Sequence, residues 1–233
     1  MRVKPVVLNT AISWLFMIGS ACFVLGSVPA YIDAVGGTID SVTYFVGSLC
    51  FTAASFAQLV QAQSSEMTGV DEQHQHVKAP VRFWARLPHD RNWLAAVTQF
   101  PGTLFFNVST LAALAHNATV QQENRRVWRP DFYGSMLFLV ASAFAILALG
   151  RFLSYQPRFL PWRIAWLNMI GSVFFMASAL ASYVLPSTGE MIDVPVSVAG
   201  TLLGAVCFLV GAALMLPAWT RAVAAAPVSS HDP

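Results

Sequence analysis

Four polar side chains recur along one apolar stretch of the chain, at about 93–115. They are Gln99, Thr103, Asn107 and Thr110. At 100° per residue these positions fall within about 80° of one another, so they form one stripe on a helix. Asn168, in a later apolar stretch, is a fifth candidate. Such amides and hydroxyls are typical of a polar binding face or a pathway through a membrane bundle.

The same residues have a second interpretation, which is hydrogen bonding between packed helices. We favour it because amide and hydroxyl contacts are common between membrane helices. No charged residue is expected at mid-depth in any apolar stretch, whereas ion-coupled transporters commonly carry one there. This argues against a proton or cation pump.

Three arginines, Arg125, Arg126 and Arg129, lie in the connection 116–132. Their forked guanidinium donors fit a phosphate, a lipid head group or an anionic solute. A solvated external loop with local pairs between arginines and carboxylates such as Asp131 explains the same residues. We favour the loop and keep the anion site as the alternative.

Metal and enzyme chemistry have little support in the sequence. His74 and His76 form an H-x-H beside acids, but a flexible loop without a second ligand cluster is favoured, and metal binding there stays open. Cys22, Cys50 and Cys207 lie inside apolar stretches and offer no CxxC site. No G-x-S-x-G, H-E-x-x-H or Walker pattern occurs. We therefore predict no enzyme and no cofactor.

The elements that position these residues follow from composition. Hydrophobic residues make up 56% of the 233 residues and charged residues 10%, against about 25% charged in a soluble domain. Six apolar stretches lie at about 12–32, 43–60, 93–115, 132–150, 164–185 and 196–217. At about 1.5 Å per residue, each is long enough to cross a hydrocarbon core of about 30 Å. The predicted fold class is all-α, with six transmembrane helices.

The basic residues orient this bundle. With the N-terminus inside, the cytoplasmic segments hold ten of the thirteen Lys and Arg residues, and the connection 116–132 holds the other three. Both termini are therefore predicted to be cytoplasmic. The net charge of +2 is small and dispersed, so we expect no nucleic-acid partner.

A glycine followed four residues later by phenylalanine occurs in every apolar stretch. The glycines are Gly19, Gly47, Gly102, Gly134, Gly171 and Gly204, and the phenylalanines are Phe23, Phe51, Phe106, Phe138, Phe175 and Phe208. Small residues return seven positions after each glycine, which keeps them on one helix face and allows close packing. We predict three pseudo-repeated hairpins around an axis along the membrane normal, with these residues as the packing motif.

The predicted units follow from the hairpins and their connections. They are a first hairpin at 1–63, a cytoplasmic or interfacial loop at 64–92, a second hairpin at 93–151, a third hairpin at 152–220 and a disordered cytoplasmic tail at 221–233. The loop mixes aromatic residues with arginines, a composition typical of a segment lying on the membrane surface.

The pattern W-L-x-M-I-G-S-x-x-F occurs twice, from Trp14 to Phe23 and from Trp166 to Phe175. Followed by a second G-S-x-x-F helix, it resembles the YrhK-like domain, a two-helix membrane module of bacteria. The run from Trp128 to Ser135 looks like larger uncharacterised actinobacterial membrane proteins that carry this module. The resemblance implies a multi-pass protein of the bacterial plasma membrane and no particular activity.

Two classes of function stay open. The first is a non-enzymatic bundle that serves structure or binds lipid, a partner or a small molecule. The second is a transporter or channel for a small solute, with Gln99, Asn107 and Asn168 on its path. An intramembrane enzyme is the least favoured, and the oligomeric state is left open. A dry axis filled by Phe and Gly favours the first class, and a wet cavity lined by the amides favours the second.

Overall fold

The computed structural model describes residues 2–3, 5–64, 79–115, 118–150 and 155–225. The long helices in this part of the chain are α1 (Pro5–Gly26), α3 (Gly37–Gln63), α4 (Arg91–Ala112), α6 (Arg129–Ala148), α7 (Leu160–Ala181) and α8 (Val194–Ala225). Shorter elements are α2 (Pro29–Val35), α5 (Val120–Glu123) and a π-helical turn, η1 (Asn124–Trp128). Two short strands, β1 (Arg2–Val3) and β2 (Ala79–Pro80), pair antiparallel. His74 and His76 lie outside the described residues.

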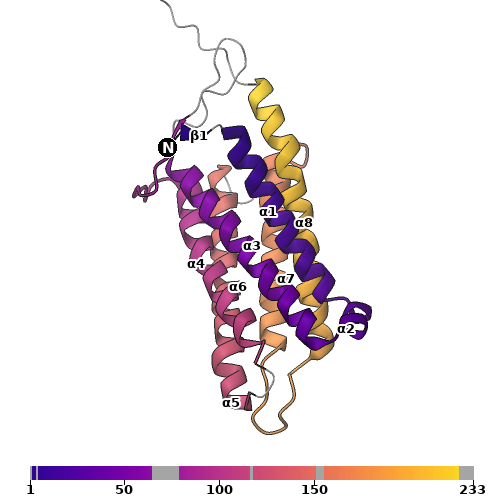
Figure 1. Cartoon of the computed structure of the whole chain (residues 1–233). Coiled ribbons are helices and arrows are strands. Elements are labelled where there is room, and N and C mark those ends of the chain that lie inside the picture. Colours follow the sequence, from indigo (N-terminus) through magenta and orange to yellow (C-terminus); the bar gives the residue numbers. More distant parts are fainter. Residues whose placement is uncertain (1, 4, 65–78, 116–117, 151–154, 226–233) are drawn as a thin grey trace, which may run out of the picture.

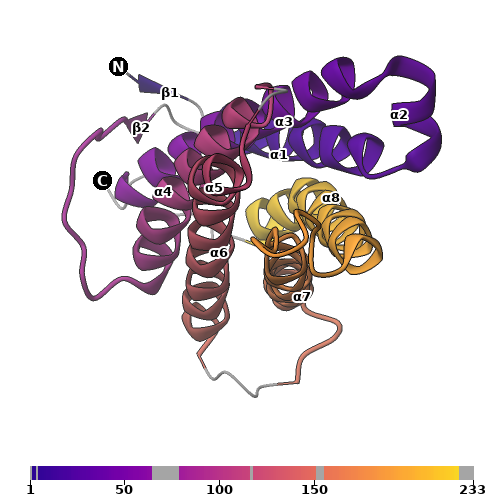
Figure 2. The ribbon, with the colours of Figure 1, turned by 90° about the horizontal axis from the view of Figure 1, so that it is seen from below.

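The long helices form a ring of three pairs. The strongest contacts join α1 to α3, α4 to α6 and α7 to α8, and contacts of α3 with α4, α6 with α7 and α8 with α1 close the ring. Figure 2 shows the three pairs around a common centre. The N-terminus and the last turn of α8 lie at one end of the bundle, here called the terminal end (Figure 1). The opposite end, here called the hairpin end, carries α2, α5 and the 182–193 loop.

Five described helical segments are long and apolar enough to cross a membrane, which identifies a multi-pass membrane protein. They are Val6–Gly26, Gly37–Gln63, Val120–Ala148, Leu160–Ala181 and Val194–Ala218. Helix α4 has 22 residues, the same length as α1 and α7, but it is not among the five. Its polar stripe and its proline lower its apolar content. The sixth crossing therefore stays a prediction.

Local sequence signals explain where several helices begin and end. Asp90 precedes α4, and its carboxylate accepts hydrogen bonds from the backbone N–H groups of Asn92 and Trp93 at 2.8 and 3.3 Å. Thr119 forms a capping box with Gln122 at the start of α5. Gly36, at φ +80°, separates α2 from α3 in a conformation that favours glycine.

The external loop predicted at 116–132 is wrong over most of its length. From Val120 the chain is helical through α5, the π turn and α6, as one segment that reaches Ala148. Two side chains of this segment form hydrogen bonds with α7 and the loop after it. The side-chain amide of Asn124 donates to the carbonyl of Val184, and the indole N–H of Trp128 donates to the carbonyl of Ala179 at 2.8 Å. These contacts, together with the capping box, stabilise helical structure where the charged residues of the sequence had suggested a solvated loop. The predicted tail also begins later, since α8 extends to Ala225.

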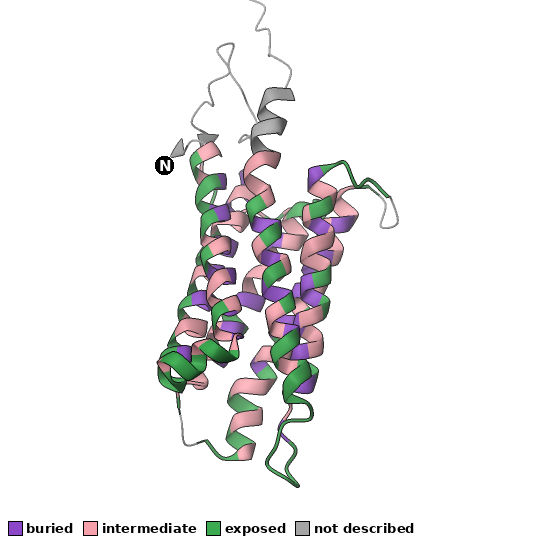
Figure 3. Cartoon of the chain, turned by 90° about the vertical axis from the view of Figure 1, so that its right-hand side faces the viewer, coloured by how far each residue is buried: buried purple, intermediate pink, exposed green. Residues whose placement is uncertain are grey.

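Each aligned glycine lies against the partner helix of its own pair. A Cβ built on Gly19 would lie 2.9 Å from the carbonyl oxygen of Gly47, and one on Gly171 would lie 3.0 Å from that of Gly204. On Gly134 it would lie 3.1 Å from the carbonyl oxygen of Gly102. Beside each glycine packs the phenylalanine of the partner helix. Buried residues follow the inward faces of the helices, whereas the outward faces are exposed (Figure 3).

Candidate functional site: two cavities on the bundle axis

The centre of the bundle is filled by six phenylalanines, one from each long helix. They are Phe23, Phe51, Phe106, Phe138, Phe175 and Phe208, each 2 to 7% exposed. The three from α3, α6 and α8 form a triangle, with ring centroids 5.6 to 6.4 Å apart. Phe175 contacts both Phe23 and Phe106, at 6.1 and 6.0 Å. The rings therefore form two adjacent layers, here called the phenylalanine plug.

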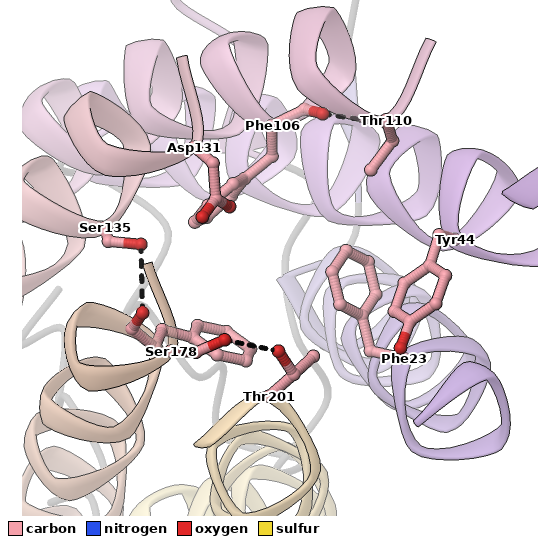
Figure 4. A pocket seen from close by; sticks show the side chains of 9 residues that line it. Phe23, Tyr44, Phe106, Thr110, Asp131, Ser135, Ser178 and Thr201 are labelled. Atoms are coloured by element: carbon pink, nitrogen blue, oxygen red, sulfur yellow. Dashed lines mark hydrogen bonds between the residues drawn. The ribbon is translucent and has the colours of Figure 1, made fainter. Parts of the chain in front are cut away.

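A cavity of about 110 Å³ lies on the hairpin-end side of the plug. Its phenyl wall is formed by Phe23, Phe106 and Phe175, and its polar lining consists of Tyr44, Thr110, Asp131, Ser135, Ser178 and Thr201. Figure 4 shows Asp131 pointing into this space from α6. The lining draws on all six long helices, so this hairpin-end cavity lies on the bundle axis.

The side chain of Asp131 has no hydrogen bond or ion pair with any residue that the structure describes. Its place in the first turn of α6 is a correction to the sequence analysis, which put it in a solvated loop. Asp131 belongs to the candidate span Val120–Ala148. Its carboxyl group faces the hairpin-end cavity. A carboxylate without a counter-charge inside a helical bundle is costly, which makes Asp131 the first candidate for a functional residue.

The hydroxyl groups of this cavity give their hydrogens to other protein groups. Ser135 donates to the carbonyl of Phe175 at 3.4 Å, as Figure 4 shows. The hydroxyls of Ser178 and Thr201 both lie within hydrogen-bond distance of the carbonyl of Ser197 and 2.7 Å from each other, so their two hydrogens serve two of these three contacts. Thr110 bonds to the carbonyl of Phe106 and to Ser48. A hydroxyl has one hydrogen and two lone pairs, so these oxygens are left to present lone pairs to the cavity.

Tyr44 completes the set. Its hydroxyl lies 2.9 Å from that of Ser27, and Ser27 donates its own hydrogen to the carbonyl of Phe23 at 2.8 Å. With the Ser27 hydrogen on that carbonyl, Tyr44 donates in the bond between the two hydroxyls. The hairpin-end cavity thus offers a carboxyl group and hydroxyl oxygens that can accept hydrogen bonds.

A second cavity, of about 90 Å³, lies on the terminal-end side of the plug. It is lined by Phe16, Gln58, Gln99, Ile164, Asn168, Phe208, Ala212 and Met215. Gln99 and Asn168, two residues of the predicted polar face, therefore share one cavity, together with a third amide, Gln58, which sequence analysis missed. This terminal-end cavity carries no charged side chain.

The rest of the predicted polar face binds neighbouring helices. Asn107 donates from Nδ2 to the hydroxyl of Thr52 at 2.8 Å, and Thr103 is fully buried and bonds to the carbonyl of Phe100. Thr110 both contacts α3 and lines the hairpin-end cavity. Some residues of the polar stripe on α4 thus form hydrogen bonds with α3, and others line one of the two cavities.

The three arginines of the predicted anion site lie outside both cavities described above. Arg125, Arg126 and Arg129 are all exposed. Within the described residues, no group of three His, Cys, Asp or Glu side chains is placed to hold a metal ion. Cys22, Cys50 and Cys207 are free thiols.

The residues three positions before the six aligned glycines all line one of the two cavities. The position three before each aligned glycine is Tyr44, Asp131 and Thr201 on α3, α6 and α8, and all three line the hairpin-end cavity. The same position is Phe16, Gln99 and Asn168 on α1, α4 and α7, and these line the terminal-end cavity. Of these six residues, the sequence analysis proposed only Gln99 and Asn168 as site residues. No family model, curated protein sequence or solved structure matches the chain.

Proposed function

We propose that this protein is a non-enzymatic, six-span membrane bundle of three related hairpins, whose closed axis serves ligand or partner binding instead of free passage of solute. The observation that carries the proposal is the phenylalanine plug. Six buried rings, each with a neighbouring ring centroid at 6.4 Å or less, lie between the two cavities, as expected for a packed barrier. The glycine contacts within each pair support the three-hairpin arrangement.

Closure is tested by flux in reconstituted liposomes. We expect the wild-type protein to leave a trapped small dye and a potassium gradient intact. Replacing Phe51, Phe138 and Phe208 together by alanine removes the triangular layer and is expected to produce a leak, provided that the variant still purifies as a folded protein. Free leakage through the wild-type protein would overturn the proposal.

We propose further that both termini face the cytoplasm of a bacterial cell and that α4 is the sixth span. The excess of basic residues at the terminal end supports this orientation. Phe83 and Trp84, 59% and 91% exposed, are suited to anchoring the segment before α4 at the membrane surface. The resemblance to YrhK-like modules is consistent with this bacterial location.

Cysteine labelling tests this topology. In a variant whose three native cysteines are replaced by alanine, single cysteines at Arg86 and Gln156 are expected to be protected from an impermeant reagent added outside cells. Single cysteines at Asp33, Thr119 and Ser187 are expected to react. Labelling of Arg86 and Thr119 from the same side would show that α4 does not cross the membrane.

A second candidate function is transport of a small solute by alternating access. The two polar cavities, separated by a thin aromatic barrier, favour it, because a transporter exposes a central site to one side at a time. Uptake into cells that express the protein, compared with an Asn168→Leu variant, is the corresponding measurement. Uptake that is saturable and lost in that variant would favour transport over the closed binding bundle.

A further inference from the structure

We propose that the hairpin-end cavity is a binding site for one monovalent cation, either an alkali ion or a small primary ammonium, held by the carboxylate of Asp131. This inference is independent of whether the bundle transports anything. It rests on three features of the cavity: its charge, its hydrogen-bonding polarity and its size.

The charge of the lining selects the sign of the ligand. Asp131 is the one ionisable acid in the lining and has no basic partner among the described residues. The nearest arginine in the sequence, Arg129, is exposed. A single carboxylate balances one positive charge in a low-dielectric site, whereas divalent cations commonly require several carboxylates.

The hydrogen-bonding pattern of the lining favours a hydrogen-bond donor or a metal ion over an anion. The hydroxyls of Tyr44, Ser135 and Ser178 each have an acceptor within the protein for their one hydrogen, which leaves oxygen lone pairs for the cavity. Oxygen lone pairs are the ligands of alkali ions and the acceptors for ammonium N–H groups. The lining also contains Phe23, Phe106 and Phe175, a residue type that can contact a cation through its ring.

The size and the surroundings agree with a small cation. A volume of about 110 Å³ admits a partly hydrated alkali ion or a short alkylammonium, since a water molecule occupies about 30 Å³. Asp40, one helical turn before Tyr44 on α3, is 8% exposed, and its Oδ1 has no described hydrogen-bond partner. With Asp33, Glu123, Glu190 and Asp193, the hairpin end carries six acids against three arginines, a balance that attracts cations.

The terminal-end cavity provides a contrast within the same molecule. Its polar residues are the amides Gln58, Gln99 and Asn168, which offer both donors and acceptors and no charge. It is suited to water or a neutral solute. The plug separates the two, so the cation preference belongs to the hairpin-end cavity alone.

The test is titration calorimetry on the full chain in phosphatidylcholine nanodiscs. Sodium, potassium and methylammonium chloride are titrated separately, with ionic strength held constant by tetraethylammonium, which has no N–H donor. We expect saturable binding of one cation per chain by at least one of the three salts. The relative affinities for the alkali ions and for methylammonium show whether the site prefers a metal ion or a primary ammonium group.

Asp131→Asn keeps the shape of the side chain and removes its charge, and we expect it to abolish binding. Asp33→Asn, which removes an exposed acid from the same end, is the matched control and should bind as the wild type does. If Asp131→Asn does not fold, Ser135→Ala replaces it as the test variant and is expected to weaken binding about tenfold. No binding by the wild type, or unchanged binding in the test variant, overturns the proposal.

Discussion

Gly19 and Gly47 approach so closely that a side-chain carbon on either one would lie within 3.0 Å of the other's carbonyl oxygen. Gly171 and Gly204 form the same contact in the α7–α8 pair. The rings of the partner helices, such as Phe51 beside Gly19, occupy the remaining space. Helix contact through glycine and closure of the axis through phenylalanine are therefore parts of one arrangement, and the first predictions test each part.

Replacing Gly47 by alanine is expected to destabilise the protein by about 1–3 kcal/mol, because the new Cβ would lie 2.8 Å from the Cβ of Cys22 and must push α1 away from α3. Reversible unfolding in sodium dodecyl sulfate measures the change. Gly37→Ala is the matched control: nothing lies within 4 Å of its added Cβ, and it should be neutral or slightly stabilising. Equal effects of the two substitutions would contradict the role of close approach.

Phe138→Ala is expected to cost about 3–5 kcal/mol of unfolding free energy, because the ring is 2% exposed and contacts Phe51, Phe106 and Phe208. The same unfolding assay applies. Phe105→Ala, at a 38% exposed position on the outer side of α4, should cost much less. A small effect at Phe138 would mean that the plug is loosely packed.

The hydrogen bond between Asn107 and Thr52 is expected to contribute about 0.5–2 kcal/mol to stability. A double-mutant cycle with Asn107→Ala and Thr52→Val isolates this coupling. Additive effects of the two substitutions would show that the bond contributes nothing measurable. Solute uptake, if any occurs, should survive Asn107→Ala, since Asn107 lines neither cavity described above.

Asn124 joins the π turn to the loop after α7. Its side chain donates to the carbonyl of Val184 at 2.7 Å and accepts from the N–H of the same residue at 3.1 Å. Asn124→Ala leaves both groups of Val184 without their partner and is expected to cost about 1–3 kcal/mol. Arg125→Ala, at the exposed neighbouring position, is the control. Limited proteolysis within 182–193 should accelerate in the first variant and stay unchanged in the second.

The sequence by itself determined that the chain is helical and belongs in a membrane, because long apolar stretches leave the backbone no other way to satisfy its hydrogen bonds in lipid. Its regular spacing also located the glycines and phenylalanines that lie at the helix contacts, since a seven-residue period keeps side chains on one face. These properties are local and can be read along the chain.

Only the tertiary structure decided the environment of Asp131. A charged residue at the border of an apolar stretch fits a solvated loop as well as the first turn of a helix, and its own neighbours in sequence include three arginines. Contacts of Asn124 and Trp128 with residues more than 50 positions away extend the helix back to Val120. The carboxyl group then shares a cavity with the hydroxyls of Tyr44, Ser178 and Thr201, and a cavity built from six helices is a property that no single stretch of sequence contains.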